Sequence, residues 1–269
     1  FRAMLIIRND AGYLRLSELL TAAYVGKDRN VHHAELNPEW LENGDNSGLI
    51  CLSGAHYGEV GVNLLNGNED AARAAALKYA AWFPDAFYLE LQRLPERPEW
   101  EACVSGSVKL AEELGLPVVA THPTQFMSRD DFNAHEARVC IAGGWVLTDK
   151  KRPRDFTPSQ FFIPPETMLE RFADLPEALE NTVEIAKRCN IHITLGKNFL
   201  PLFPTPDGLS LDDYLVKLSN EGLQERMVQL YPDEAERAAK MPEYQERLDF
   251  ELNIIIQMKF PGYFLIVQD

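Results

Sequence analysis

Four ionisable side chains lie where the strands of an α/β protein would end, the position from which reactive groups usually act. They follow or finish short apolar runs of the sequence: His56, Glu59, Glu90 and His122. In a parallel sheet the carboxyl ends of neighbouring strands share one edge, so the loops there converge on a substrate. Imidazole and carboxylate groups gathered at one edge can bind a metal ion or act as general bases. His56, Glu59 and His122 are thus the candidate nucleus of such a site, with Glu90 beside them.

A structural role competes with this interpretation, and the number of residues favours it. Two histidines and one carboxylate are few for a metal site, and such residues often cap loops or bind backbone groups. No nucleophile motif accompanies them, because Ser53 lies in Leu-Ser-Gly instead of GxSxG, and His135-Glu136 lacks the second histidine of HExxH. The residues by themselves therefore predict no catalytic group.

The charge balance argues against a grip on nucleic acid over most of the chain. The 269 residues carry 26 Lys and Arg against 41 Asp and Glu, a formal net charge of −15. A surface that binds duplex phosphates needs a basic face. One compact basic turn is the exception, and its four cations are candidate contacts to phosphate or to a partner: Lys150, Lys151, Arg152 and Arg154. A solvated loop is the simpler explanation of such a run.

Cysteine usage and hydropathy predict the compartment. The four cysteines are widely spaced and contain no CxxC pair, which is typical of reduced thiols in a cytoplasmic protein. The longest apolar run is too short to span a bilayer. We therefore expect a cytoplasmic location and no membrane contact.

The order of the elements predicts an α/β fold with a parallel sheet, either a barrel or an open sheet, followed by helices. Apolar runs predict strands over residues 3–7, 48–54, 87–91, 117–121 and 191–195. Helical spacing predicts helices through residues 16–23 and over 69–82, 98–114, 135–142, 176–189, 210–229 and 243–258, with one more that starts at Pro232. Three prolines between residues 198 and 208 predict an extended boundary.

Several segments together resemble the alpha subunits of bacterial DNA polymerase III, most closely the proteobacterial type. The most specific segment is 260–267, Phe-Pro-Gly-Tyr-Phe-Leu-Ile-Val; the others are residues 52–54, 90–91, 116–121, 134–139, 151–154 and 181–189. Any one string is weak, but the ordered set covers essentially the whole chain. Because the sequence begins without methionine and stops mid-element, just after 260–267, we also expect a piece of a longer protein.

The resemblance implies two parts. Residues 1–200 would form a PHP (polymerase and histidinol phosphatase) domain, an incomplete (β/α)7-like barrel that lacks its first strands. Residues 201–269 would be a proline-rich connection and an α-helical lead-in to the polymerase palm. The palm aspartates that bind magnesium would come later, so the resemblance implies magnesium for the whole polymerase and no catalytic residue or cofactor in this chain.

The resemblance also bears on the candidate site. Metal-bearing PHP domains have a cysteine after the segment 52–54 and an Asp-x-His pair after the strand 117–121, and these ligands support phosphoester hydrolysis. Here Ala55 replaces the cysteine, Pro123 and Gln125 replace the pair, and Arg2 occupies a further histidine position. Alanine and proline have no ligand atom, and a glutamine amide is a poor donor to transition metals. The resemblance thus implies a vestigial metal site.

Within such a polymerase the resemblance implies a metal-free scaffold that stabilises the alpha subunit and docks the separate proofreading exonuclease, epsilon, alongside other replisome subunits. Synthesis from DNA and deoxynucleotides would belong to the palm. Two alternatives stay open. One is an active PHP metallophosphoesterase or 3′ to 5′ exonuclease with His56, Glu59 and His122 as substitute ligands, and the other is a pure interaction module, for which the acidic surface is suggestive.

Overall fold

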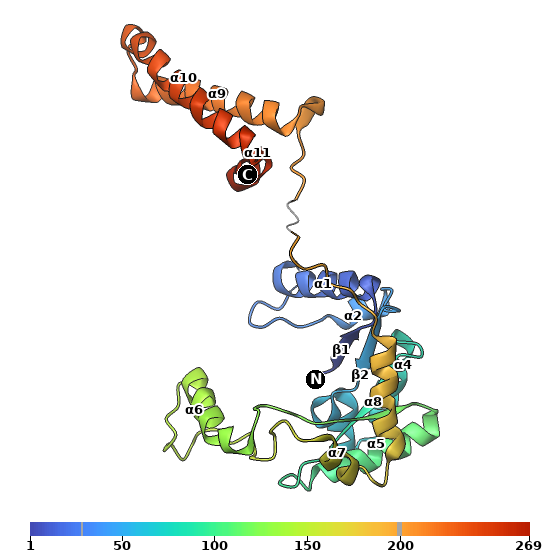
Figure 1. Cartoon of the computed structure of the whole chain (residues 1–269). Coiled ribbons are helices and arrows are strands. Elements are labelled where there is room, and N and C mark those ends of the chain that lie inside the picture. Colours follow the sequence, from blue (N-terminus) through green and yellow to red (C-terminus); the bar gives the residue numbers. More distant parts are fainter. Residues whose placement is uncertain (28, 198–200) are drawn as a thin grey trace. The chain divides into compact units, whose positions relative to one another are not determined.

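Short apolar segments pair side by side to form the sheet of the amino-terminal part of the chain (Figure 1). The computed structural model describes residues 1–27, 29–197 and 201–269. Among these residues the strands follow the spatial order β1 (Met4–Ile7), β2 (Leu49–Leu52), β3 (Phe87–Gln92) and β4 (Val118–Thr121). The predicted α/β class is confirmed, and the expected incomplete barrel takes the form of an open four-stranded sheet.

The direction of β1 differs from the predicted parallel sheet. β2, β3 and β4 run parallel, whereas β1 runs antiparallel to β2, with Ile7 opposite Leu49 and Met4 opposite Leu52. The reason is the connection. The chain leaves β1 and enters β2 at the same end of the sheet, through α1 (Asp10–Val25) and α2 (Pro38–Glu42), so no crossover is made.

The strand predicted over residues 191–195 is wrong. These residues have no regular secondary structure, and Ile193 and Leu195 are exposed. The alternation of Ile191, Ile193 and Leu195 imitates a strand, but a strand needs a partner for its backbone groups. Among the described residues near this segment, Asn190 N–H donates to the carbonyl of Arg8, which follows β1. No other backbone hydrogen bond from this described segment to the strands is seen.

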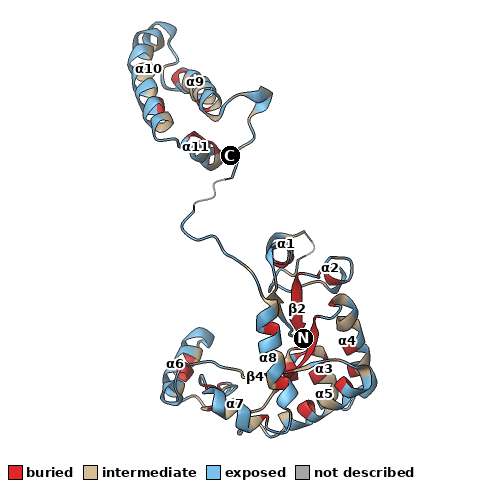
Figure 2. Ribbon diagram, turned by 45° about the vertical axis from the view of Figure 1, so that its right-hand side comes forward, coloured by how far each residue is buried: buried red, intermediate tan, exposed pale blue. Residues whose placement is uncertain are grey.

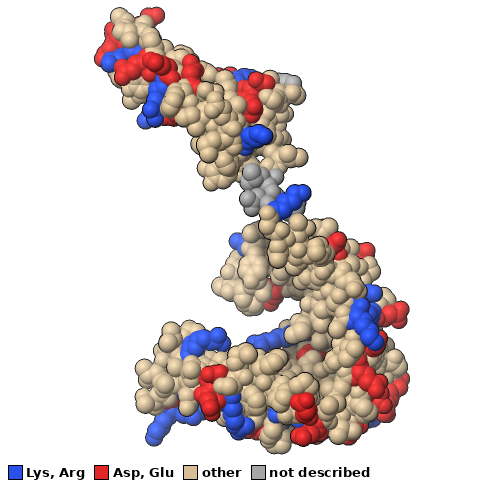
Figure 3. Space-filling view, in the orientation of Figure 1, with Lys and Arg blue, Asp and Glu red and all other residues tan. Residues whose placement is uncertain are grey.

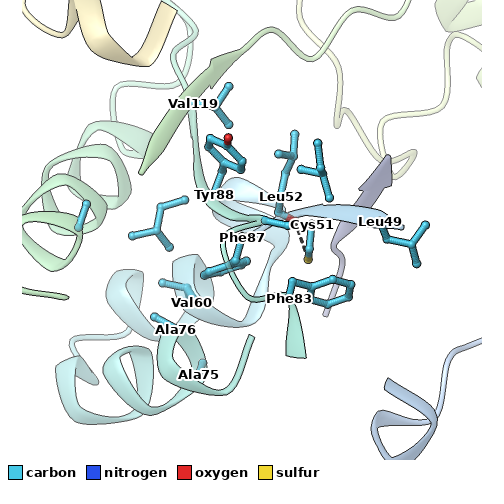
Figure 4. Close-up of a cluster of buried hydrophobic side chains, with 14 of the residues drawn as sticks. Leu49, Cys51, Leu52, Val60, Ala75, Ala76, Phe83, Phe87, Tyr88 and Val119 are labelled. Carbon is cyan, nitrogen blue, oxygen red and sulfur yellow. Dashed lines mark hydrogen bonds between the residues drawn. The ribbon is translucent and has the colours of Figure 1, made fainter. Parts of the chain in front are cut away.

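The core forms where helices cover the parallel strands. β2 is buried along its whole length (Figure 2). Figure 4 shows Val60, Phe83 and Phe87 among the buried side chains that pack around it. They come from β3 and from the region of α3 (Glu59–Leu65) and α4 (Glu69–Trp82), while α5 (Trp100–Leu114) packs on β3 and α8 (Pro176–Arg188) on β4. Helix α4 begins and ends at the predicted residues.

One helix stands apart from the layers around the sheet. α6 (Phe132–Gly143) projects away from it in Figures 1 and 2, after the short 3-10 turn η2 (Arg129–Asp131). A parallel bridge between Phe126 and Phe161 joins the two chain segments at its base. α7 (Pro165–Arg171) follows and leads into α8.

The chain divides into two compact units, Phe1–Ile193 and Thr194–Asp269. The sequence-based boundary at residue 200 falls on residues 198–200, outside the described residues. The second unit contains the 3-10 turn η3 (Pro206–Gly208) and the helices α9 (Leu211–Leu230), α10 (Glu234–Gln257) and α11 (Pro261–Gln268). Leu215, Leu252 and Leu265, one from each helix, form its buried core.

The sequence predicts the start of α9 correctly but wrongly divides α10 into two helices. Ser210 caps α9, and its hydroxyl accepts a hydrogen bond from Asp213 N–H. The two helices predicted from Pro232 and over 243–258 are one continuous helix, α10, with Pro242 inside it. A proline removes one intrahelical N–H bond, but packing on one side can hold the helix together across it. The separate helices were thus a wrong prediction.

Lys259 follows the C-cap residue of α10 in a strained conformation and offers a test of this unit. Its φ is 60°, the left-handed region that glycine adopts without cost and other residues avoid. We expect Lys259→Gly to raise the free energy of unfolding of this unit by roughly 0.5–1 kcal/mol. Urea unfolding followed by circular dichroism measures the change. Met258→Gly is the control and should lose stability, because Met258 has right-handed helical angles.

Within the described residues no single helix combines the length and the apolar character needed to cross a membrane. Among the described helices, α10 and α11 meet both requirements when taken together, and the chain bends by 113° between them.

Candidate functional site

The turn after β2 is built from two residues with positive φ. Gly54 has a φ of 81° and Ala55 a φ of 46°, and the 3-10 turn η1 (Ala55–Tyr57) follows. A side chain at Gly54 is impossible, because a Cβ there would come within 2.1 Å of the Arg2 carbonyl oxygen. The turn therefore brings the backbone of the first residues against the carboxyl end of β2, at the edge where the sequence predicts a site.

Glu90 is the central polar group of this edge and is 3% exposed. Its Oε2 accepts a hydrogen bond from Gly54 N–H at 3.1 Å. Its Oε1 accepts from Thr121 Oγ1 at 2.5 Å and from Gln92 Nε2 at 3.1 Å. Its own backbone N–H donates to Ser53 Oγ. The carboxylate thus joins the ends of β2, β3 and β4, and three donors occupy most of the lone pairs a ligand would need.

His56 points into an aromatic environment. Its ring stacks on Trp100, with 3.5 Å between the centroids, and lies 4.0 Å from the ring of Tyr57. It is 8% exposed, and neither ring nitrogen has a hydrogen-bond partner among the described residues. Burial lowers the pKa of His56 to about 4, and the positive charge of Arg97 adds to the effect. His56 is therefore neutral at physiological pH.

We expect His56 to make the chain less stable as the pH falls. Between its ordinary pKa, 6.5, and about 4, the unfolded chain binds a proton at this residue that the folded chain does not. Stability is then complete above pH 6.5 and falls on acidification, by up to about 1.4 kcal/mol per pH unit for this group. His56→Phe should keep the stacking at pH 7 and flatten this slope by one proton. Urea titrations at several pH values measure it, and an unchanged slope would contradict the buried neutral ring.

Glu59 and His122 are each engaged elsewhere. Glu59 opens α3 and forms an ion pair with Lys78, whose Nζ lies 2.6 and 2.8 Å from its two oxygens. Both residues line a cavity of about 960 Å³, whose walls include Tyr79 and Trp82. His122 Nε2 donates to the Phe161 carbonyl at 3.0 Å.

The other ring nitrogen of His122 faces a cation. Nδ1 accepts from the Arg171 guanidinium at 3.3 Å, which fixes the neutral tautomer that carries its proton on Nε2. Burial lowers the pKa of His122, and the Arg171 charge lowers it further. The protonated ring that an acid catalyst needs is therefore disfavoured at this position.

The donor set at this edge does not fit a metal ion. Ala55 is buried and offers no donor atom. Pro123 contributes only its carbonyl, which accepts from Gln160 Nε2 at 3.1 Å, and Gln125 is exposed. No group of three His, Cys, Asp or Glu side chains that could hold a metal occurs in the described part of the chain. His56, Glu59 and His122 belong to separate environments, so their convergence at one site is not found.

The basic turn separates into one buried and three exposed cations. Arg152 is 9% exposed and pairs with Glu136 of α6, which is itself buried. Its guanidinium is used inside the protein, which leaves it less available to phosphate or a partner than the other three cations. Lys150, Lys151 and Arg154 are exposed, as predicted for a solvated turn.

Comparisons with known proteins agree with the observed fold. Residues 1–94 match the family model of the PHP domain, and residues 213–269 match that of the bacterial DNA polymerase III alpha NTPase domain. Over the whole chain it is 99% identical to the DNA polymerase III subunit alpha of Neisseria meningitidis serogroup A and 98% identical to that of serogroup B. Over 97% of the chain it is 49% identical to the subunit from Escherichia coli K12.

The chain spans about a quarter of the length of these curated relatives, 24% of each Neisseria protein and 22% of the Escherichia coli protein. The similarity is continuous, from the four-stranded sheet to the last helix. The chain therefore belongs to the family of bacterial DNA polymerase III alpha subunits, of which it contains a PHP region and the start of the NTPase-domain region.

Proposed function

We propose that this chain acts, within the alpha subunit of a replicative DNA polymerase, as a metal-free PHP scaffold that stabilises the subunit and docks its proofreading exonuclease. Residues 1–200 would be the scaffold, and residues 201–269 the connection and helical lead-in to the palm. The observation that carries the proposal is Glu90, a buried carboxylate at the expected metal edge whose oxygens are used to join three strands.

The remaining residues of the edge support the same role. A metal-dependent phosphoesterase needs several fixed ligands that lower the pKa of a bound water and hold the leaving oxygen. Here His56 is stacked on Trp100 and neutral, and Glu59 pairs with Lys78. His122 donates a hydrogen bond to the Phe161 carbonyl and accepts one from the Arg171 guanidinium. Each group that the alternative nuclease function would use has a structural partner instead.

Template-directed synthesis, with DNA, deoxynucleotides and magnesium, would then take place in the palm of the parent protein in the cytoplasm. The net charge of −15 fits a region that does not itself grip the duplex. A region of this kind contributes by holding other parts in place.

Metal content and nuclease activity test the scaffold role. The purified chain should bind zinc and manganese at well below one equivalent after dialysis, and it should not hydrolyse a single-stranded oligonucleotide above background. A His56→Phe variant serves as the matched control, because any trace activity that survives in it does not depend on His56. Stoichiometric metal with turnover that this substitution abolishes would establish the nuclease alternative instead.

Docking is tested separately with the parent alpha subunit and the epsilon exonuclease of the same organism. We expect a complex that elutes together in gel filtration and that the 269-residue chain inhibits by competition. If the chain does not compete at any attainable concentration, epsilon binds elsewhere on the parent and the docking role fails, while the structural role is unaffected.

A further inference from the structure

The tip of the α6 arm, defined here as residues 126–161, exposes apolar side chains in an unbroken run. Every residue from 141 to 148 is exposed, and we refer to these residues as the tip segment. Ile141 is 82% exposed and Val146 64%. Trp145 and Leu147, on either side of Val146 in sequence, are exposed as well. Isolated exposed apolar residues are ordinary, whereas a contiguous set usually marks an interaction surface.

The tip segment is held in a defined conformation. Gly144 ends α6 with a φ of 70°, and Trp145 N–H donates to the Cys140 carbonyl at 2.8 Å. Asp149 N–H donates to the Val146 carbonyl at 3.0 Å, and Arg152 Nε donates to the Leu147 carbonyl at 3.3 Å. The buried pair of Arg152 and Glu136 anchors this last contact. A surface fixed before binding loses less conformational entropy when a partner covers it.

Cations flank the tip segment although the chain as a whole is acidic. The α6 arm carries six Lys or Arg against five Asp or Glu, whereas the whole chain has 26 against 41. Blue side chains are visible on the arm in Figure 3. Four exposed cations form what we call the basic flank: Arg138, Lys150, Lys151 and Arg154. None of these four forms a side-chain ion pair in the described part of the chain.

Three of the five acidic side chains of the arm have partners within it. Glu136 is buried against Arg152, and Asp131 accepts hydrogen bonds from Ser128. Asp149 accepts from Lys151 N–H. Between residues 138 and 155 the four cations of the basic flank outnumber the two carboxylates, Asp149 and Asp155, since Arg152 is paired with Glu136. The charge beside the tip segment is therefore positive on balance, and a binding surface complementary to it is negative.

We propose that the tip segment and basic flank are a docking surface for an acidic, amphipathic segment of a partner protein. The inference rests on the proposed scaffold role and names the surface that would carry it. Aliphatic side chains such as Ile141, Val146 and Leu147 have no counterpart on a phosphate backbone, which favours a protein partner over nucleic acid. The basic flank would select the partner's charge, and the tip segment would supply most of the affinity.

The test uses a fluorescent helical peptide with leucine and phenylalanine on one face and glutamate on the other. Its anisotropy is measured with the 269-residue chain and with variants. We expect Ile141→Ser/Val146→Ser to weaken binding at least about tenfold. Lys150→Glu/Lys151→Glu should weaken it and also remove much of its dependence on salt. Exposed controls of the same residue kinds elsewhere on the chain, Leu77→Ser on α4 and Lys217→Glu on α9, should bind like the unaltered chain.

Each contrary result overturns the inference. No binding to the unaltered chain, or equal binding to all variants, removes the docking surface. Tighter binding of duplex DNA, lost only in the Lys150→Glu/Lys151→Glu variant, assigns the surface to nucleic acid. If the peptide does not bind the full-length parent, the parent's own chain covers the tip. If the chain forms concentration-dependent dimers that Ile141→Ser/Val146→Ser abolishes, a second copy covers it.

The same variants in the parent separate this inference from the proposed function. If epsilon binds the parent but binds both arm variants equally well, docking stands and the α6 arm is not its surface. If epsilon does not bind the parent while the peptide result holds, the arm serves another acidic partner and the docking of epsilon fails.

Discussion

Replacing Arg152 with alanine is expected to lower the free energy of unfolding of the α6 arm by about 3–5 kcal/mol, because it leaves a buried carboxylate unpaired. Arg152 and Glu136 are both buried, and the Arg152 guanidinium also donates to the carbonyls of Leu147 and Pro153. The substitution therefore removes both the ion pair with Glu136 and the hydrogen bond that holds the Leu147 carbonyl of the tip segment. Hydrogen exchange, followed by mass spectrometry, should be faster over residues 132–157 in the variant than in the unaltered chain. Exchange in β2 and β3 should change much less.

Two variants distinguish the ion pair from a general effect of removing a cation. Arg154→Ala removes an exposed neighbour two positions away and should change stability by less than about 0.5 kcal/mol. Arg152→Met combined with Glu136→Leu replaces the pair by apolar side chains, and it should recover most of the loss. A double variant as unstable as Arg152→Ala would mean that packing, and not the stranded charge, determines the result.

The strands that the sequence predicts well are those whose burial does not depend on their partners. β2 is buried at every residue and β3 at all but the last, so a short continuous apolar run identifies them without regard to direction. The direction of β1 and the missing strand at 191–195 depend instead on where the connection returns and on whether a neighbour is present. Neither is encoded within the segment itself.

Helix ends show the same division between local and distant causes. The cap at Ser210 is a local hydrogen bond, and the sequence predicts it correctly. Pro242 is a local signal for a break, yet α10 continues through it and packs against α9, where Gln245 donates to Asn220. The predicted break failed for that reason.

For the candidate site, the sequence identifies positions but not partners. His56 and Glu90 do lie at the carboxyl edge of the sheet, where the alternation of strands and helices places them. Their partners are separated in sequence: Gly54 lies 36 positions from Glu90, and Lys78 lies 19 positions from Glu59. No local pattern distinguishes Arg152 from the other cations of its turn, because its burial depends on Glu136, 16 positions earlier. Trp100, which stacks on His56, was not singled out for the same reason.

Replacing Glu90 with alanine is expected to destabilise the amino-terminal unit by about 2–4 kcal/mol, since three buried or half-buried donors lose their acceptor. They are the Gly54 N–H, the Thr121 hydroxyl and the Gln92 amide, one from each of three neighbouring chain segments. Because the carboxylate joins β2, β3 and β4, the loss should appear in the global unfolding transition, in contrast to the local effect of Arg152→Ala. Urea unfolding monitored by far-ultraviolet circular dichroism measures it.

The size and sign of this change decide what Glu90 is for. A carboxylate kept for metal binding usually costs stability, so its removal leaves a protein equally or more stable while activity disappears. A structural carboxylate behaves in the opposite way. Glu90→Gln retains one oxygen acceptor for Thr121 and should lose only about half as much unfolding free energy as Glu90→Ala.

Glu112→Ala on the exposed surface of α5 is the matched control and should be neutral within about 0.5 kcal/mol. If Glu90→Ala were as stable as that control, Glu90 would not be the structural link between the strands, and the case for a scaffold at this edge would lose its main support.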